Sequence, residues 1–194
     1  MDFVLDLDKS LFVFFNSLGS KYFDSFWLFI SESDIIEVIY LFLVIEFLRF
    51  FKIKDLKSIL IFLLSMILMI VFTDQSSNFF KEFFERLRPC HNPELIEIIR
   101  IVKDGCGGLY GFFSAHAANT FAFASFIYFL TPNENNYKRT SFLLFIWAAI
   151  ISYSRIYIGV HFPLDIIIGA IYGLLSGYLF HKPFLYFRKS KLIL

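Results

Sequence analysis

The sequence predicts an all-α integral membrane protein, a helical bundle of about five transmembrane helices preceded by an N-terminal interfacial helix. Composition and five long apolar runs predict this class. Hydrophobic residues make up 58% of the 194 residues and charged residues only 18%, so a soluble globule would have too little polar surface. The net charge is +1, and no polar strip interleaves bases with aromatic residues, which argues against nucleic-acid binding.

The N-terminal segment is predicted to stay on the mature protein. Residues 1–9 are acidic where a signal peptide would be basic, and no small-residue cleavage pattern follows. Leu5, Phe12, Phe15 and Leu18 recur at helical spacing among polar residues, which favours a helix lying in the membrane interface. A packed amphipathic segment without a function of its own is the alternative.

Five runs are long and apolar enough to cross a bilayer core of about 30 Å, which needs about 20 helical residues. No internal repeat or flexible linker divides the chain, so residues 1–194 are expected to form a single membrane-embedded domain. The runs are centred on residues 35–51, 58–72, 115–130, 141–158 and 164–180.

Basic residues outside the runs predict the orientation. Those of the first connection, the third connection and the tail fall on one side after five crossings, which the positive-inside rule assigns to the cytoplasm. The second connection and the one around His161 then share the opposite side. The second connection is also basic, so either its bases have a role outside or the topology is inverted. The cytoplasmic set is Arg49, Lys52, Lys54, Lys57, Lys138, Arg139, Lys182, Arg188, Lys189 and Lys191; the second connection holds Lys81, Arg86, Arg88, Arg100 and Lys103.

Lys81 and Arg88 are seven residues apart, so on a helix both would point the same way. Pro89 favours the end of that helix, because the residue before a proline is pushed out of helical geometry. The two cations could converge at the membrane surface. A pair of snorkelling bases that only anchors a helix end is the alternative.

A glycine-rich stretch, residues 107–111, leads to the third apolar run. Ser114 suits a helix N-cap, which would leave the amides of Ala115 and His116 facing outward at the positive end of the helix dipole. Such a terminus can bind an anion, and His116 could give a proton to a leaving oxygen. An ordinary cap with an interfacial histidine is the alternative.

Three ionisable residues lie close together between the last two apolar runs. His161 and Asp165 are four apart with Pro163 between them, which favours a helix that begins near Phe162. Asp165 could bind one ring nitrogen and leave the other free to attack phosphorus, while Arg155 offers a fork for two phosphate oxygens. A structural ion cluster is the alternative.

In these residues the sequence resembles the type 2 phosphatidic acid phosphatase superfamily, whose pattern is K-x6-R-P, then P-S-G-H, then S-R-x5-H-x3-D. Residues 81–89 and 154–165 match the first and third motifs with full spacing. The middle motif differs, because Phe113 replaces proline and Ala115 replaces glycine, while Ser114 and His116 are kept. We expect a site that is tuned rather than lost.

The resemblance implies that His161 is a nucleophile that forms a phosphohistidine, that Asp165 orients it, and that His116 protonates the leaving group and then activates water. It implies no metal and no cofactor. The phosphate oxygens would be held by Lys81, Arg88, Ser114, Ala115 and Arg155.

We therefore expect a phosphatase of a lipid phosphate or diphosphate in the cytoplasmic (inner) membrane, with its site facing the periplasm or cell exterior. Undecaprenyl diphosphate, phosphatidylglycerophosphate and lipid A phosphate are the leading substrates. A non-catalytic membrane lipid-binding or scaffold protein is the alternative. Vanadium haloperoxidases share the site, but they are soluble, and the apolar runs argue against that activity.

Cys90 and Cys106 are the two cysteines, and both lie in the second connection. A disulfide there would fix Arg88 relative to Ser114, and two free thiols are equally compatible with the sequence. Asp74 could position Lys81 from one or two helical turns away. The sequence does not indicate an oligomeric state.

Overall fold

The computed structural model describes residues 2–33, 35–131 and 135–189. Within these ranges the regular elements are helices, and the one pairing of extended backbone is a bridge between Leu87 and Tyr110. The elements are α1 Asp2–Ser17, α2 Lys21–Glu32, α3 Ile35–Phe50, α4 Leu56–Phe84, the 3-10 helix η1 Pro89–His91, α5 Ala115–Leu130, α6 Asn135–Tyr157 and α7 Pro163–Lys189.

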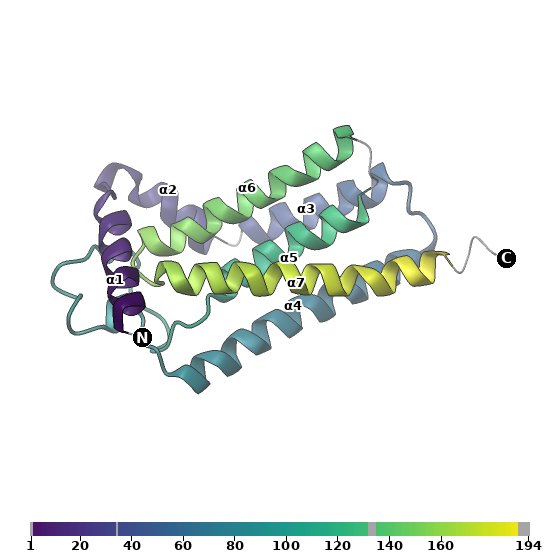
Figure 1. Ribbon diagram of the computed structural model, residues 1–194. Helices are drawn as coiled ribbons and strands as arrows, with labels where there is room; N and C mark the ends of the chain where they lie inside the picture. The colour runs from purple at the N-terminus through teal and green to yellow at the C-terminus, as the bar shows by residue number, and fades with distance from the viewer. Residues whose placement is uncertain (1, 34, 132–134, 190–194) are drawn as a thin grey trace.

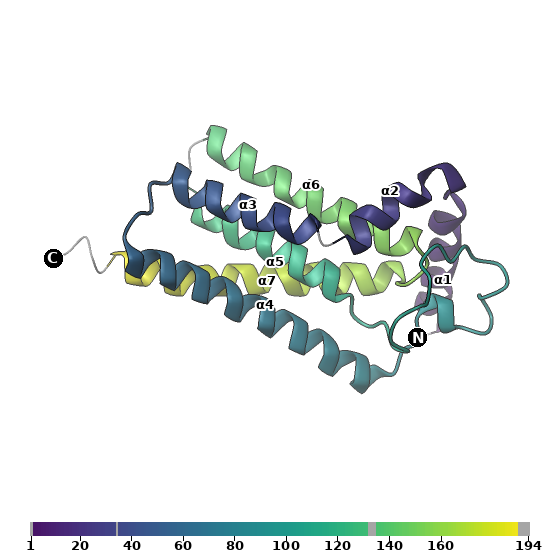
Figure 2. The ribbon, with the colours of Figure 1, turned by 180° about the vertical axis from the view of Figure 1, so that it is seen from behind.

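Helices α3 to α7 lie lengthwise in one bundle, and α1 crosses one end of it (Figure 1). Figure 2 shows from behind that α2 and the α4–α5 connection lie at that same end, away from the C-terminus. There the backbone amide of Val102 donates to the carbonyl of Ile158 at 3.3 Å, which joins the α4–α5 connection to the α6–α7 connection. The two connections that carry the predicted site residues therefore meet. Of the basic tail used to predict orientation, Lys191 lies outside the described residues.

Helix α5 forms the centre of the bundle, with 10 of its 16 residues buried. Small residues allow it to lie close against α7. A Cβ atom on Gly173 would lie 2.2 Å from the carbonyl oxygen of Ala118, so a larger residue there would push the helices apart. At the site end, the amide of Ser114 donates to the carbonyl of Asp165 at 3.1 Å, which fixes the start of α5 against the start of α7.

Three helical stretches are long and apolar enough to cross a membrane: Leu56–Phe84, Tyr137–Tyr157 and Pro163–Phe187. Leu60, Leu64 and Ile67 of α4 are more than half exposed, as expected of a lipid-facing surface. Helices α3 and α5 have 16 residues each. That length spans about 24 Å at about 1.5 Å per residue, so the count of five spans stays a prediction.

The N-terminal segment forms two helices, whereas the sequence predicted one. The buried side chain of Asn16, at the end of α1, donates to the carbonyls of Arg100, Ile156 and Tyr157 at 3.0 to 3.2 Å. The chain then turns into α2, which packs against α6. Sequence reasoning missed α2 because residues 21–32 mix charged and aromatic side chains, and their tertiary contacts decide the conformation.

Candidate active site

His161 and Asp165 lie at the start of α7, which begins at Pro163, one residue from the predicted start. Both residues are enclosed, with exposed fractions of 2% for His161 and 0% for Asp165. The Nδ1 atom of His161 lies 3.4 Å from Oδ2 of Asp165, and the amide of Phe162 donates to the same oxygen at 3.0 Å. The carboxylate is thus oriented toward one ring nitrogen.

The surroundings of His161 favour a neutral ring. Burial, and then the charges of Arg155, Arg88 and Lys81, hold the pKa of His161 well below its usual value. A neutral imidazole keeps a lone pair at neutral pH, which a nucleophile needs.

Arg155, in the last turn of α6, is anchored by α2. Its Nη1 atom donates to the carbonyl of Ser31 at 3.1 Å, to the Ser31 hydroxyl and to the carboxylate of Glu32. Its side chain is 3% exposed, and its Nε is buried without a hydrogen-bond partner among the described residues. A buried unpaired guanidinium N–H is costly unless an anion accepts from it.

Glu32 binds a second cation, Lys103, in addition to Arg155. Lys103 donates to Glu32 at 2.5 Å. Burial on its own raises the pKa of Glu32, but Lys103 and Arg155 outweigh it and lower the pKa. Glu32 is therefore a carboxylate that links α2, α6 and the α4–α5 connection. The motifs gave no signal for Ser31 or Glu32, because their partner Arg155 lies more than 120 residues later in the sequence.

Lys81 and Arg88 do not share a helix, so the predicted helical pairing is wrong. Helix α4 ends at Phe84, and Glu85 adopts a left-handed conformation with φ 48°. Arg88 follows in extended backbone, where its amide donates to the carbonyl of Leu109 at 3.1 Å. The helix is thus capped at Glu85, four residues before the proline that was expected to end it.

The two cations are nevertheless held by partners of their own. The Arg88 guanidinium donates to the carbonyls of Tyr110 at 3.1 Å and Cys106 at 3.3 Å. Along α4, the Nζ of Lys81 donates to Asn78 at 3.4 Å, and Asn78 in turn donates to Asp74 at 3.4 Å. Asp74 and Lys81 are therefore connected through Asn78, which lies about one helical turn from each of them.

The start of α5 has the predicted capped geometry. Ser114 is the N-cap, and its hydroxyl accepts from the amide of Ala117 at 3.4 Å. Ala115 and His116 form the first turn, and His116 is exposed where it lines a cavity. Phe113, which occupies the proline position of the family pattern, is 1% exposed.

Gly111 lets the α4–α5 connection approach the histidine. A Cβ atom there would lie 3.2 Å from Oδ2 of Asp165, 3.2 Å from Cγ of Arg88 and 3.6 Å from Nδ1 of His161. Any side chain would displace the His161–Asp165 pair or Arg88. Sequence reasoning noted the glycines of this stretch without identifying this contact.

Arg86 and Asp8 are further residues that the motifs did not identify. Nη1 of Arg86 donates to Oδ1 of Asp165 at 2.7 Å, and Nη2 donates to Asp8 of α1. The only sequence signal was the basic character of the second connection. The bases of this connection therefore include one that binds a carboxylate of the site.

The structure joins Cys90 and Cys106 in a disulfide, with their Cα atoms 5.9 Å apart. The bond closes a loop of the α4–α5 connection. Because the carbonyl of Cys106 accepts from Arg88, the loop and the cation are fixed together.

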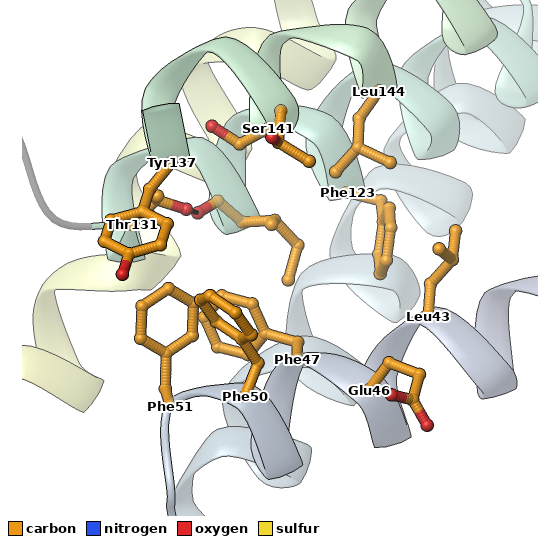
Figure 3. Close-up of a pocket in the computed structure, with 12 residues that line it drawn as sticks. Leu43, Glu46, Phe47, Phe50, Phe51, Phe123, Thr131, Tyr137, Ser141 and Leu144 are labelled. Atoms are coloured by element: carbon orange, nitrogen blue, oxygen red, sulfur yellow. Dashed lines mark hydrogen bonds between the residues drawn. The ribbon is translucent and has the colours of Figure 1, made fainter. Parts of the chain in front are cut away.

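Two cavities differ sharply in character. One of about 380 Å³ lies beside His116. Another, of about 420 Å³, lies at the opposite end of the bundle between α3, α5 and α6, where Figure 3 shows Phe47, Phe50 and Phe51 facing Tyr137. The second is apolar and contains none of the candidate site residues.

The cluster at the end of the bundle can hold an oxyanion next to a neutral histidine. Lys81, Arg88 and Arg155 supply positive charge, and the start of α5 supplies backbone amides. Across the described residues no group of three His, Cys, Asp or Glu side chains is placed to hold a metal.

A family model described as the PAP2 superfamily matches residues 58–189. The chain belongs to the PAP2 superfamily. The PAP2 match extends from α4 to α7, and it includes every predicted site residue. Helices α1 and α2, which supply Asp8 and Glu32, lie outside it.

Two curated relatives align with most of the length of this PAP2 chain. The lipid A 4′-phosphatase of Porphyromonas gingivalis is 35% identical over an alignment of 194 positions, which covers 97% of this chain and 77% of the relative. The lipid A 4′-phosphatase of Bacteroides thetaiotaomicron is 34% identical over 184 residues, with 93% and 78% covered.

Two crystal structures share the fold. Aquifex aeolicus LpxE matches with a TM-score of 0.61 and 26% identity, over 91% of this chain and 95% of that one. A transmembrane PAP2 type phosphatidylglycerolphosphate phosphatase from Bacillus subtilis matches with a TM-score of 0.69 over 93% and 85% of the chains. Its identity is 19%, so it supports the fold alone.

Proposed function

We propose that this PAP2 protein is an integral membrane phosphatase that hydrolyses a lipid phosphate through a phosphohistidine. The observation that carries the proposal is the enclosed His161, whose Nδ1 faces Oδ2 of Asp165 and whose pKa is lowered by burial and by the charges of Arg155, Arg88 and Lys81. Phosphoryl transfer chiefly needs positioning and positive charge around the equatorial oxygens, and this cluster offers both.

In the first step, Nε2 of His161 attacks phosphorus, and the bond between phosphorus and the leaving oxygen breaks. His116 gives its proton to that oxygen. In the second step, His116 takes a proton from water, whose oxygen attacks the phosphohistidine. The N–P bond breaks, inorganic phosphate leaves, and both histidines return to their starting states.

The phosphate oxygens would be bound by side chains and by backbone. Arg155 would use Nε, which is buried and without a partner among the described residues, while Nη1 stays on Ser31 and Glu32. Arg88 and Lys81 would add charge, and Ser114 would add its hydroxyl. Ala115 would offer its backbone amide, for which an alanine serves as well as a glycine as long as φ is helical.

We infer that the substrate is a lipid A type 4′-phosphate, ahead of undecaprenyl diphosphate and phosphatidylglycerophosphate. Two relatives that are 35% and 34% identical carry the name lipid A 4′-phosphatase. No metal is needed in this scheme, because the cations of the cluster neutralise the developing charge.

Release of inorganic phosphate by the purified protein tests the proposal. The panel contains lipid A 4′-phosphate, undecaprenyl diphosphate and phosphatidylglycerophosphate, each with wild type and His161→Asn. The proposal predicts release from at least the first substrate and none with the variant. A folded wild-type protein that binds these lipids and releases no phosphate would support the scaffold alternative.

We further propose five spans in the cytoplasmic membrane, with the site facing the periplasm or cell exterior. After reduction, Cys90 and Cys106 should react with a membrane-impermeant thiol reagent on intact spheroplasts. Labelling only after the membrane is permeabilised would invert the orientation.

A further inference from the structure

The cavity of about 380 Å³ beside His116 is enclosed by residues from α2 to α6. Its volume is within the range of about 300–1,000 Å³ that small-molecule sites occupy. Its lining includes Ser31, Glu32, Asp74, His116 and Asn119. Since His116 is the proposed proton donor to the leaving oxygen, the group attached to that oxygen must occupy space next to His116.

The charged side chains that line this cavity differ from those of the phosphate cluster. Two carboxylates, Glu32 and Asp74, line it, and no lysine or arginine of the described chain does. Glu32 is already shared between Arg155 and Lys103, and Asp74 meets Asn78 at 3.4 Å. A second phosphate placed here would face like charges, whereas hydroxyl groups would find acceptors.

Asn119 adds a donor to the lining. Its side-chain amide lies 2.5 Å from the hydroxyl oxygen of Thr73, and this contact orients the amide. The amide still offers an N–H donor, which can serve hydroxyl or carbonyl oxygens of a ligand.

We propose that this cavity binds the leaving group and selects a neutral, hydroxyl-bearing one, such as a sugar, over one that carries a second phosphate. The inference rests on the proposed function, because it needs His116 beside the leaving oxygen. It makes the enzyme a monophosphatase of glycolipid-like substrates. A diphosphate has the intrinsically better leaving group, so a preference for the monophosphate has to come from the cavity.

The test compares kcat/KM for a prenyl monophosphate and the prenyl diphosphate of the same chain length, with lipid A 4′-phosphate as the sugar substrate. We expect wild type to prefer the monophosphate by about 100-fold. Asp74→Asn and, independently, Glu32→Gln should reduce this ratio by about 10-fold. Asn119→Leu should lower kcat/KM for the sugar substrate more than for the prenyl monophosphate.

Glu82→Gln is the matched control, because Glu82 is an exposed carboxylate of α4 outside the cavity, and the ratio should not change. Equal wild-type activity on both prenyl substrates would overturn the inference while leaving the proposed function intact. Unchanged ratios in Asp74→Asn and Glu32→Gln would also overturn it. If no substrate of the panel is hydrolysed, the proposed function itself fails.

A separate observation concerns Asp8 of α1. Asp8 is 5% exposed, its Oδ2 accepts from Arg86, and its Oδ1 accepts from the amide of Leu164 at 2.8 Å. Arg86 in turn pairs with Asp165 at 2.7 Å and lies over the ring of Phe162, 4.3 Å from its centre. One carboxylate of the N-terminal helix thus contacts both the first turn of α7 and the cation that binds Asp165.

We infer that Asp8 and Arg86 are positioning residues for the nucleophile. Arg86 draws Oδ1 of Asp165 away from His161, so that Oδ2 is the oxygen left for Nδ1. Asp8 holds Arg86 in that place. Among the described residues, neither side chain forms a hydrogen bond or ion pair with the proposed phosphate-binding side chains, so both act through Asp165. Helix α1 thereby contributes to the active site.

The test uses Asp8→Asn, Arg86→Met and Arg86→Lys with an aryl phosphate substrate. We expect kcat to fall about 10- to 100-fold in the first two, with KM within about two-fold, and partial recovery in Arg86→Lys. Glu94→Gln is the control, because it removes a surface ion pair between α1 and the α4–α5 connection at Lys9. Unchanged kcat in folded Asp8→Asn and Arg86→Met, or a loss confined to KM, would overturn the inference.

Discussion

The Oδ2 atom of Asp165 lies 3.4 Å from Nδ1 of His161, and neither residue is more than 2% exposed. The carboxylate is held on both sides, because Phe162 donates to Oδ2 and Arg86 donates to Oδ1. With Nδ1 occupied by Asp165, Nε2 is the nitrogen available for chemistry.

Asp165→Asn should lower kcat by about 100- to 10,000-fold, the range expected for groups that orient or activate a catalytic base. The amide can present N–H instead of an acceptor to Nδ1, which favours the wrong tautomer. Steady-state kinetics on an aryl phosphate would measure the loss. Asp104→Asn, an exposed carboxylate of the α4–α5 connection, is the control. A change of less than about three-fold in Asp165→Asn would argue against orientation by this carboxylate.

His161 should stay neutral well below its usual titration range. Because burial and three nearby cations disfavour the imidazolium form, the lowered pKa means that the neutral ring persists as pH falls through about 6.5. NMR of histidine-labelled protein, with the His161 signal assigned from its loss in His161→Asn, would follow the ring directly. A midpoint at or above the usual value would contradict the account of its surroundings.

Arg155→Lys should impair binding of phosphate although it keeps the charge. A lysine cannot both anchor to Ser31 and Glu32 and present a second N–H to an anion, as the guanidinium fork does. We expect the inhibition constant of inorganic phosphate to rise about 10-fold or more. Arg139→Lys, an exposed base at the opposite end of the bundle, should leave the constant unchanged.

Loss of the Cys90–Cys106 disulfide should lower the stability of the protein and loosen the positioning of Arg88. A closed loop of about 15 residues contributes about 3 kcal/mol in the chain-entropy model. The double variant Cys90→Ser/Cys106→Ser should melt at a lower temperature than oxidised wild type, and KM should rise because Cys106 accepts from Arg88. Equal melting temperatures would show that closing this loop does not stabilise the fold.

The sequence was sufficient to predict the His161–Asp165 pair because that contact is local. Four residues separate the two, and Pro163 begins the helix that sets their geometry. The pattern of apolar runs placed the α4–α5 and α6–α7 connections on the same side of the membrane, and in the structure the two connections are in contact. These inferences needed only helical spacing and the parity of the crossings.

The remainder of the site depends on contacts that spacing cannot reveal. Glu85 ends α4 in a left-handed conformation, so Arg88 reaches the site from extended backbone. Arg155 is anchored by Glu32, 123 residues earlier, and Arg86 by Asp8, 78 residues earlier. Both anchors come from N-terminal helices outside the family match, where no motif marked them.

The most direct test is to trap the phosphoenzyme. Wild type is mixed with a labelled aryl phosphate, quenched in alkali to preserve an N–P bond, digested and analysed by mass spectrometry. His116→Ala should accumulate more label, because an aryl leaving group needs little protonation while attack by water is slowed. We expect phosphate on His161 of wild type and no phosphoenzyme in His161→Asn. Turnover retained in His161→Asn, or phosphate found on another residue, would contradict it.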